Sequence, residues 1–236
     1  MGGNALISCI MATSDRPQFL KRALKYFMNQ TYLQSELIIV DDGISPMTDI
    51  VCIDNPRINY IKLDKKTPLG TKLNIGISHA RGDIIQKLDD DDWYHPYFLK
   101  TAISHLLAAG TEGCIVAWDC FMIYFSGEAY ARFSGHGWGA GGTLCFKRSL
   151  WNKIPFRDVS QAEDYWFKKD HEERVVKVHM PLQYMLVRHG KNTWRNAMRD
   201  GRDVDTDIRS HSGYQKPLNH FLSRGDAEFY YSLPSI

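Results

Sequence analysis

Apolar and polar positions alternate along the first 110 residues in a pattern that predicts strands and helices in turn. Short, largely apolar runs predict buried strands, and stretches with apolar residues at every third or fourth position predict amphipathic helices. The expected strands are residues 5–11, 36–40, 58–63 and 84–88, and the expected helices are residues 17–29, 69–80 and 96–109. Strands that alternate with helices indicate an α/β fold with a mostly parallel sheet flanked by helices.

The alternation ends after about residue 112, and the rest of the chain is less regular. We expect one or two strands in each of residues 114–125 and 175–187, a short strand at 142–146, and helices at 147–151 and 163–169. Residues 134–142 are rich in glycine and predict a loop. Beyond residue 200 the pattern indicates only a helix near 217–223.

Composition narrows the class of protein. The chain has 236 residues, of which 44% are hydrophobic, which is enough for one substantial globular domain. A net charge of +2 gives no strong basic field for nucleic acid, and there is no apolar run of about 18 residues to span a membrane. The first residues lack the charged and apolar regions of a secretory signal. Peripheral membrane association and oligomerisation remain open.

The five cysteines are scattered and form no Cys-x-x-Cys pair, which argues against a zinc site and against a disulfide framework. Free cysteines indicate a reducing compartment, so we expect a cytoplasmic protein. The histidines show no paired metal-ligand spacing either, among them His79, His95, His105, His171 and His179.

Polar clusters follow three of the expected strands: residues 13–16, residues 41–42, and an acid run of four aspartates at 89–92. Ligands bind beyond the carboxyl ends of parallel strands, so these clusters predict a site. Four adjacent carboxylates repel one another, and their oxygens suit Mg²⁺ or Mn²⁺, which share coordination with substrate phosphates. The alternative is a solvated acidic turn. The apolar strand before the run and Trp93 after it favour the site.

An ordered set of motifs places these clusters in a wider pattern. It comprises IMATSDRP at 10–17, QTY at 30–32, IIVDDG at 38–43, LG at 69–70, NIG at 74–76, ARGD at 80–83 and LDDDD at 88–92. Together the motifs resemble glycosyltransferase family 2, which has the Rossmann-like GT-A fold, over roughly residues 4–200. The resemblance implies transfer of a sugar, with inversion, from a nucleoside-diphosphate sugar to a hydroxyl acceptor such as a glycan or lipid-linked sugar. A UDP-sugar is the preferred donor, ahead of dTDP- and GDP-sugars. The metal would be Mn²⁺ or Mg²⁺.

The resemblance also divides the chain. It implies one glycosyltransferase domain at 1–200, with a nucleotide-binding half at 1–112 and an acceptor and catalytic half at 113–200. Residues 201–236 would form a C-terminal extension.

For the nucleotide, the resemblance implies that Thr13 lies by the base or ribose. Asp42 would accept a hydrogen bond from uracil, with support from Asp41, although a tight turn before Gly43 is a serious alternative for Asp41. The other residues assigned to the nucleotide are Asp15, Arg16, Lys72, Asp89 and Asp90. For Lys72 a solvated position on a helix is the ordinary alternative.

For the metal and the diphosphate, the Asp-x-Asp element of the family maps onto residues 89–91. Asp91 is then the expected direct metal ligand, while Asp89 or Asp90 would reach the ribose or a metal-bound water, and Asp92 is held in reserve. In the late segment 187–194, His189 would complete the metal site. The basic residues expected at the diphosphate are Arg188, Lys191 and Arg195.

For the acceptor, the resemblance implies that Asp164 is the general base, since transfer to a hydroxyl requires a group to take its proton. The alternative for this pair of acids is a place in the first turn of a helix, where they would favour the helix dipole, and it suits Glu163 better than Asp164. Glu163, Trp138, Gly141 and Gly142 are expected beside the donor or acceptor sugar, because glycines let the backbone approach a ligand closely. A plain flexible loop is nearly as good an interpretation of the glycines, and a structural role is the ordinary one for Trp138 and for His136.

Two other functions compete with this interpretation. A sugar-nucleotide nucleotidyltransferase would share the parallel sheet and the metal-carboxylate site, but it requires a glycine-rich phosphate loop after the first strand, where residues 13–17 contain no glycine. A non-catalytic nucleotide-sugar or glycan-binding module would not need Asp164 beside an intact acid run.

Overall fold

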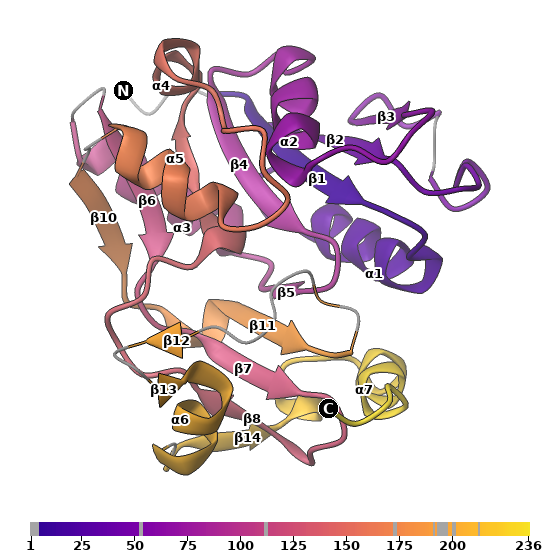
Figure 1. Cartoon of the computed structure of the whole chain (residues 1–236), viewed down its shortest axis with the longest axis vertical. Helices are drawn as coiled ribbons and strands as arrows, with labels where there is room; N and C mark the ends of the chain where they lie inside the picture. Colours follow the sequence, from indigo (N-terminus) through magenta and orange to yellow (C-terminus); the bar gives the residue numbers. More distant parts are fainter. Residues whose placement is uncertain are drawn as a thin grey trace.

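The computed structural model describes residues 5–51, 54–110, 113–171, 174–190, 192, 198–199, 202–211 and 213–236. Figure 1 shows a larger sheet flanked by helices, with a smaller sheet beside it. No helix among these residues has the length and apolarity needed to cross a membrane.

The larger sheet has seven strands in the order β10-β6-β9-β4-β1-β2-β3. Every neighbouring pair is parallel except the two pairs that involve β9. The strands are β1 (Ile7–Thr13), β2 (Ser35–Asp41), β3 (Ile58–Lys62), β4 (Ile84–Asp89), β6 (Cys114–Trp118), β9 (Cys145–Lys147) and β10 (Arg174–Val178). The predicted mostly parallel α/β sheet is therefore confirmed.

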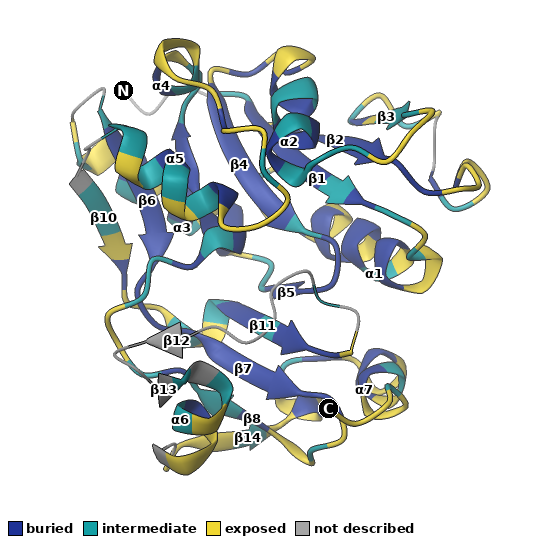
Figure 2. Cartoon of the chain, in the orientation of Figure 1, coloured by how far each residue is buried: buried dark blue, intermediate teal, exposed yellow. Residues whose placement is uncertain are grey.

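Helices cover both faces of this sheet. On one face lie α1 (Pro17–Met28) and α3 (Phe98–Ala108); on the other lie α2 (Leu69–Ser78), α4 (Arg148–Lys153) and α5 (Glu163–His171). In β1, Cys9 and Met11 pack in the first layer and Ile10 packs in the second. Because both faces are covered, the central strands β1, β2 and β4 are buried at nearly every position (Figure 2).

The smaller sheet has the order β14-β8-β7-β11-β5. Its strands are β5 (Trp93–Tyr94), β7 (Met122–Phe125), β8 (Tyr130–Phe133), β11 (Tyr184–Arg188) and β14 (Gln215–Pro217). Residues 114–125 and 175–187 thus each form two strands, one in each sheet. Short pairing also joins β12 (Met198–Arg199) to β13 (Arg202–Asp203). Single turns of 3₁₀ helix occur at Gly141–Thr143, Pro181–Gln183 and Leu218–His220.

The C-terminal residues pack into the body of the protein. The helix expected near 217–223 is wrong: only the 3₁₀ turn at Leu218–His220 forms there, and α7 spans Arg224–Tyr231. The reason is local, since Ser223 caps α7 by accepting a hydrogen bond from the Asp226 N–H. A further helix, α6, spans Val204–His211. Tyr230 of α7 is buried against the smaller sheet, so this end of the chain helps to complete that core.

Candidate active site

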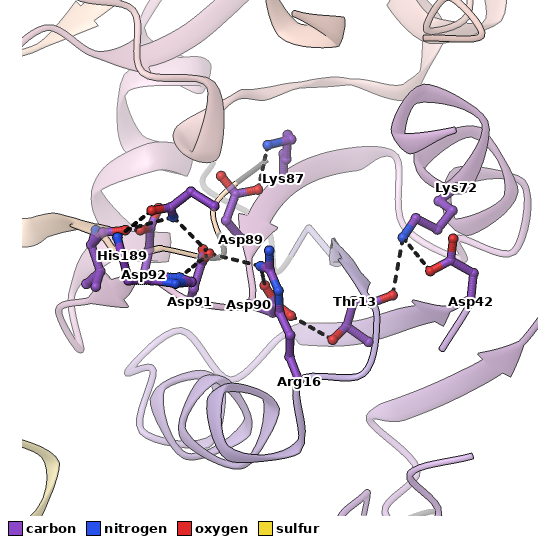
Figure 3. Close-up of polar contacts among 12 residues, drawn as sticks. Thr13, Arg16, Asp42, Lys72, Lys87, Asp89, Asp90, Asp91, Asp92 and His189 are labelled. Atoms are coloured by element: carbon purple, nitrogen blue, oxygen red, sulfur yellow. Dashed lines mark hydrogen bonds and ion pairs between the residues drawn. The ribbon is translucent and has the colours of Figure 1, made fainter. Parts of the chain in front are cut away.

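The three polar clusters that follow β1, β2 and β4 meet at one edge of the larger sheet. Thr13 pairs with Asp41 across β1 and β2, and Ala12 pairs with Asp89 across β1 and β4. The strands are parallel, so their carboxyl ends bring side chains from distant parts of the sequence together (Figure 3).

Asp90 and Asp91 are buried and share one cation. Arg16, in the turn between β1 and α1, places Nη1 2.9 Å from Asp90 Oδ1 and 2.9 Å from Asp91 Oδ2. Thr13 Oγ1 donates to Asp90 Oδ2 at 2.6 Å. Thr13 and Arg16, which were predicted to contact the nucleotide, therefore both bind carboxylates of the acid run (Figure 3).

The two carboxylates differ in how readily they ionise. Burial and the neighbouring charge of Asp91 raise the pKa of Asp90 to about 6, in spite of Arg16. Burial also disfavours the charge on Asp91, but hydrogen bonding from His189 and the attraction of Arg16 outweigh it and lower the pKa of Asp91. Within the pair, Asp91 is thus the carboxylate that stays ionised most readily.

Asp91 contacts His189, which lies 98 positions further along the chain. His189 Nε2 lies 3.0 Å from Asp91 Oδ2, and the His189 ring stacks on Phe19 with the ring centroids 4.6 Å apart. Asn192 Nδ2 donates to the same Asp91 oxygen at 3.2 Å. The sequence analysis missed Asn192, although it stands in the late segment that carries His189.

The Asp91 and His189 pair fits a divalent cation. Carboxylate oxygen and imidazole nitrogen suit Mn²⁺, and bonds of about 2.1 Å at right angles would place the two ligand atoms roughly 3.0 Å apart. Asp91 Oδ2 and His189 Nε2 already lie 3.0 Å apart. Arg16 contacts the same oxygen, so a bound cation and Arg16 would share Asp91.

Asp92 links the acid run to the smaller sheet. Its Oδ2 accepts a hydrogen bond from the Tyr184 hydroxyl at 2.5 Å, and its Oδ1 accepts one from the Val187 N–H at 2.8 Å. Burial, together with Asp91 and Asp89, raises the pKa of Asp92. Because these bonds hold β11 against the acid run, Asp92 positions His189, which directly follows β11.

Lys87 connects the acid run to the helix that carries the expected base. Its ammonium lies 2.6 Å from Asp89 Oδ1 and 3.5 Å from Glu163 Oε1, and both Lys87 and Glu163 are buried. Burial and the charges of Asp164 and Asp89 raise the pKa of Glu163 in spite of Lys87. The sequence analysis missed Lys87; its signal was a single cation inside a strand that was expected to be buried.

Replacing Lys87 by Met is expected to lower the free energy of unfolding by about 3 kcal/mol, because it leaves Glu163 buried without its cation. Urea unfolding measures this loss. Lys100→Met, on the exposed face of α3, is the matched control and should change little. Lys87→Met combined with Glu163→Gln should recover part of the loss. A single variant as stable as the wild type would show that the ion pair does not hold α5.

Asp164 lies against Gly141, and Asp89 lies against the neighbouring Gly142. A Cβ on Gly141 would meet Asp164 Oδ2 at 2.6 Å, and a Cβ on Gly142 would meet Asp89 Oδ2 at 2.5 Å. Lys168, one turn along α5, places Nζ 3.3 Å from Asp164 Oδ2 and donates to the Gly139 carbonyl at 2.6 Å. A side chain at either position would clash with a carboxylate, so both positions require glycine. The turn at these two glycines therefore lies against both Asp164 and Asp89.

The pair Asp41 and Asp42 divides into two roles. Asp41 accepts from the Gly43 N–H at 2.7 Å and from the Tyr60 hydroxyl at 2.5 Å, which is the turn that stood as the alternative. Asp42 accepts from Lys72 Nζ at 3.0 Å and from the Thr67 N–H at 2.9 Å. Burial opposes the charge on Asp42, but these contacts lower its pKa. Lys72 is buried and not solvated, and it ties Asp42 to β1.

The remaining predicted residues lie as follows. Asp15 has a left-handed backbone (φ 51°) and accepts from the Ile44 N–H at 2.6 Å. Arg188 places Nη2 2.6 Å from Asp205 of α6, so its guanidinium is engaged there. Trp138 packs edge-on against Phe121. Lys191 and Arg195 lie outside the described residues.

Known proteins resemble this chain in sequence. The profile of Glycosyl transferase family 2 matches residues 8–176. The GalNAc(5)-diNAcBac-PP-undecaprenol beta-1,3-glucosyltransferase of Campylobacter jejuni is 33% identical over 137 residues, which cover 56% of this chain and 43% of that protein. The chain spans less than half the length of the first curated relatives that it matches.

Solved structures agree on the fold. TarS 1-349 of S. aureus, in complex with UDP-GlcNAc, has a TM-score of 0.64 at 16% identity, and the match covers 96% of this chain and 70% of TarS 1-349. The mannosyltransferase PcManGT of Pyrobaculum calidifontis, in complex with GDP-Man and Mn²⁺, has a TM-score of 0.61 at 16% identity, with the same coverage. Because the profile covers well over half of the chain and the fold is that of GT-A glycosyltransferases, the chain belongs to glycosyltransferase family 2.

Proposed function

We propose that the protein transfers a sugar from a UDP-sugar to a hydroxyl group of a glycan or lipid-linked acceptor, with inversion at the anomeric carbon. The observation that carries the proposal is the position of Asp164. Its carboxylate lies against Gly141, while Asp89 of the acid run lies against Gly142. A group that can take a proton thus stands beside the residues expected to hold the donor.

The assignment of the donor rests on the strand ends. Asp42 and Thr13 are held by Lys72 at the carboxyl ends of β2 and β1, where a nucleotide would lie. UDP-GlcNAc and UDP are bound by TarS, and GDP-Man by PcManGT, proteins with the same fold. A lipid-linked acceptor is suggested by the name of the Campylobacter jejuni relative, which includes undecaprenol.

Asp91 and His189 would hold the divalent cation. When bound, the cation supplies Lewis-acid stabilisation of the negative charge on the departing diphosphate. Arg16 adds a fixed positive charge beside the same carboxylates, and Lys87 holds Asp89 in place. Asp92 keeps His189 in position through Tyr184 and the Val187 N–H.

The chemical step is a single displacement. The acceptor oxygen forms a bond to the anomeric carbon as the bond from that carbon to the diphosphate oxygen breaks, and Asp164 takes the acceptor proton. Lys168 contacts Asp164 and the Gly139 carbonyl, so it keeps the base oriented toward the glycine turn. One displacement from the opposite face inverts the anomeric centre.

The test is a panel of UDP-, dTDP- and GDP-sugars with Mn²⁺ and with Mg²⁺, measured by release of nucleoside diphosphate. Release from UDP-sugars that increases with a hydroxyl acceptor supports the proposal. Release of pyrophosphate instead would indicate a nucleotidyltransferase. Donor binding without release, across many acceptors, would indicate a binding module. Failure of all donors to bind would overturn the donor assignment.

A further inference from the structure

Four potential metal ligands converge near the outer strands of the larger sheet, apart from the acid run. Asp119 and Cys120 follow β6 in the bend before β7, His136 lies after β8, and His179 follows β10. One ligand atom from each lies within 4.8 Å of each of the others. Figure 1 shows the adjoining ends of β6 and β10 side by side, as their parallel pairing requires.

The two oxygens of Asp119 have different surroundings. Oδ1 accepts from the Gly137 N–H at 3.1 Å and lies 2.9 Å from Lys177 Nζ. Oδ2 faces His136 Nδ1 at 3.0 Å and His179 Nδ1 at 3.2 Å. Contacts to one oxygen of a carboxylate orient the other oxygen as a ligand. Asp119 therefore presents Oδ2 to both imidazoles.

The separations suit a small tetrahedral ion. Zinc bonds of about 2.0–2.3 Å would place tetrahedral ligand atoms roughly 3.3–3.8 Å apart. The two imidazole nitrogens lie 3.0 and 3.2 Å from Asp119 Oδ2, and no ligand atom of the four is more than 4.8 Å from another. Small side-chain rotations would bring all four around one ion.

Backbone hydrogen bonds connect the segments that carry the four ligands. The Asp119 N–H donates to the Val178 carbonyl at 3.0 Å, and the Trp138 N–H donates to the Asp119 carbonyl at 3.0 Å. His136 stands between Gly135 (φ +76°) and Gly137 (φ +92°), a left-handed conformation that favours glycine. The three segments are thus held together before any ion binds.

We propose that Asp119, Cys120, His136 and His179 bind a structural zinc-class ion, distinct from the cation of the donor site. Thiolate and imidazole are the ligands that select zinc over the harder Mg²⁺, and four protein ligands make a closed site. The absence of a Cys-x-x-Cys pair argued against zinc in the sequence, but that signal covers only ligands that are close in the chain. Here three separate segments supply them.

The ion would fix the position of His136, at the start of the loop 136–142, which forms one wall of the active site. From His136 the chain continues to Gly139, whose carbonyl accepts from Lys168, and then to Gly141 against Asp164. The competing explanation is a metal-free network in which Lys177 alone balances Asp119.

The experiment uses the full chain without an affinity tag, stripped with a chelator and titrated with Co²⁺. Tetrahedral Co²⁺ with a thiolate ligand shows strong visible bands and a thiolate-to-cobalt charge-transfer band. We expect these bands to saturate at about one Co²⁺ per chain and to disappear when Zn²⁺ displaces the Co²⁺, and we expect Zn²⁺ to raise the Tm of the stripped protein. Cys120→Ser should lose the charge-transfer band, and His179→Ala should weaken Co²⁺ binding about tenfold or more.

Two controls separate this site from other metal binding. His220→Ala removes an exposed histidine elsewhere, and Asp91→Asn alters the donor site; both should keep the charge-transfer band. His179 is largely exposed, so its loss should not disturb folding even if Cys120→Ser does. No charge-transfer band in the wild type, or a band that persists in Cys120→Ser, would overturn the proposal.

Discussion

Asn in place of Asp164 is expected to reduce kcat for transfer by about 10²–10⁴-fold while donor binding is retained. The amide keeps the shape that fits against Gly141 but cannot take the acceptor proton. The measurement is steady-state release of nucleoside diphosphate with acceptor present, alongside donor binding by calorimetry. The loss should appear in kcat and not in the donor Kd, because Asp164 acts on the acceptor.

Asp170→Asn is the matched control for this variant. Asp170 lies on the same helix, α5, but pairs with Arg157 away from the glycine turn. It should retain nearly all activity. Full activity in Asp164→Asn, with an unchanged rate in the control, would exclude Asp164 as the base and direct attention to Glu163, which lies beside Lys87.

Asn in place of Asp91 is expected to reduce kcat/KM by about 10²-fold or more and to weaken the dependence of the rate on Mn²⁺. Asp91 Oδ2 is the atom that Arg16, His189 and Asn192 all approach, so its charge organises this side of the site. The rate measured against Mn²⁺ concentration tests this, since the variant should need more metal for half-maximal activity.

Asp83→Asn controls for the loss of one carboxylate at β4. Asp83 directly precedes β4, at the end opposite the acid run, and its side chain is 94% exposed. Its activity and Mn²⁺ dependence should match those of the wild type. If Asp91→Asn retained its activity and its response to Mn²⁺, Asp91 would not be the metal ligand.

The carboxyl-end clusters were predictable because strand polarity fixes where a strand ends. Each of β1, β2 and β4 contains an apolar run and is followed by polar residues, and parallel strands place those ends at one edge. Thr13, Asp42 and the acid run could therefore be grouped from local patterns. Their assigned roles toward the nucleotide remain predictions.

Other parts of the site left little trace in the sequence. Lys87 is one cation in a buried strand, and its role as a partner of α5 depends on Glu163, whose Oε1 lies 3.5 Å from Lys87 Nζ. In the sequence Asp92 cannot be told from the other three aspartates of the acid run. In the structure it accepts hydrogen bonds from β11, so the four carboxylates have different partners. The strand β8 went unpredicted because its four residues are too few to show a period.

The sequence by itself determined the alternating elements, the strand ends and the membership of glycosyltransferase family 2. The family membership depends on the order of short motifs. The strands and helices depend on spacings of a few positions, because side chains repeat every two residues in a strand and every 3.6 in a helix. Only the tertiary structure decided which side chains meet. His189 reaches Asp91 across 98 positions, and His179 joins Asp119 and Cys120 from another strand. Such contacts depend on the path of the whole chain, and no local spacing encodes them.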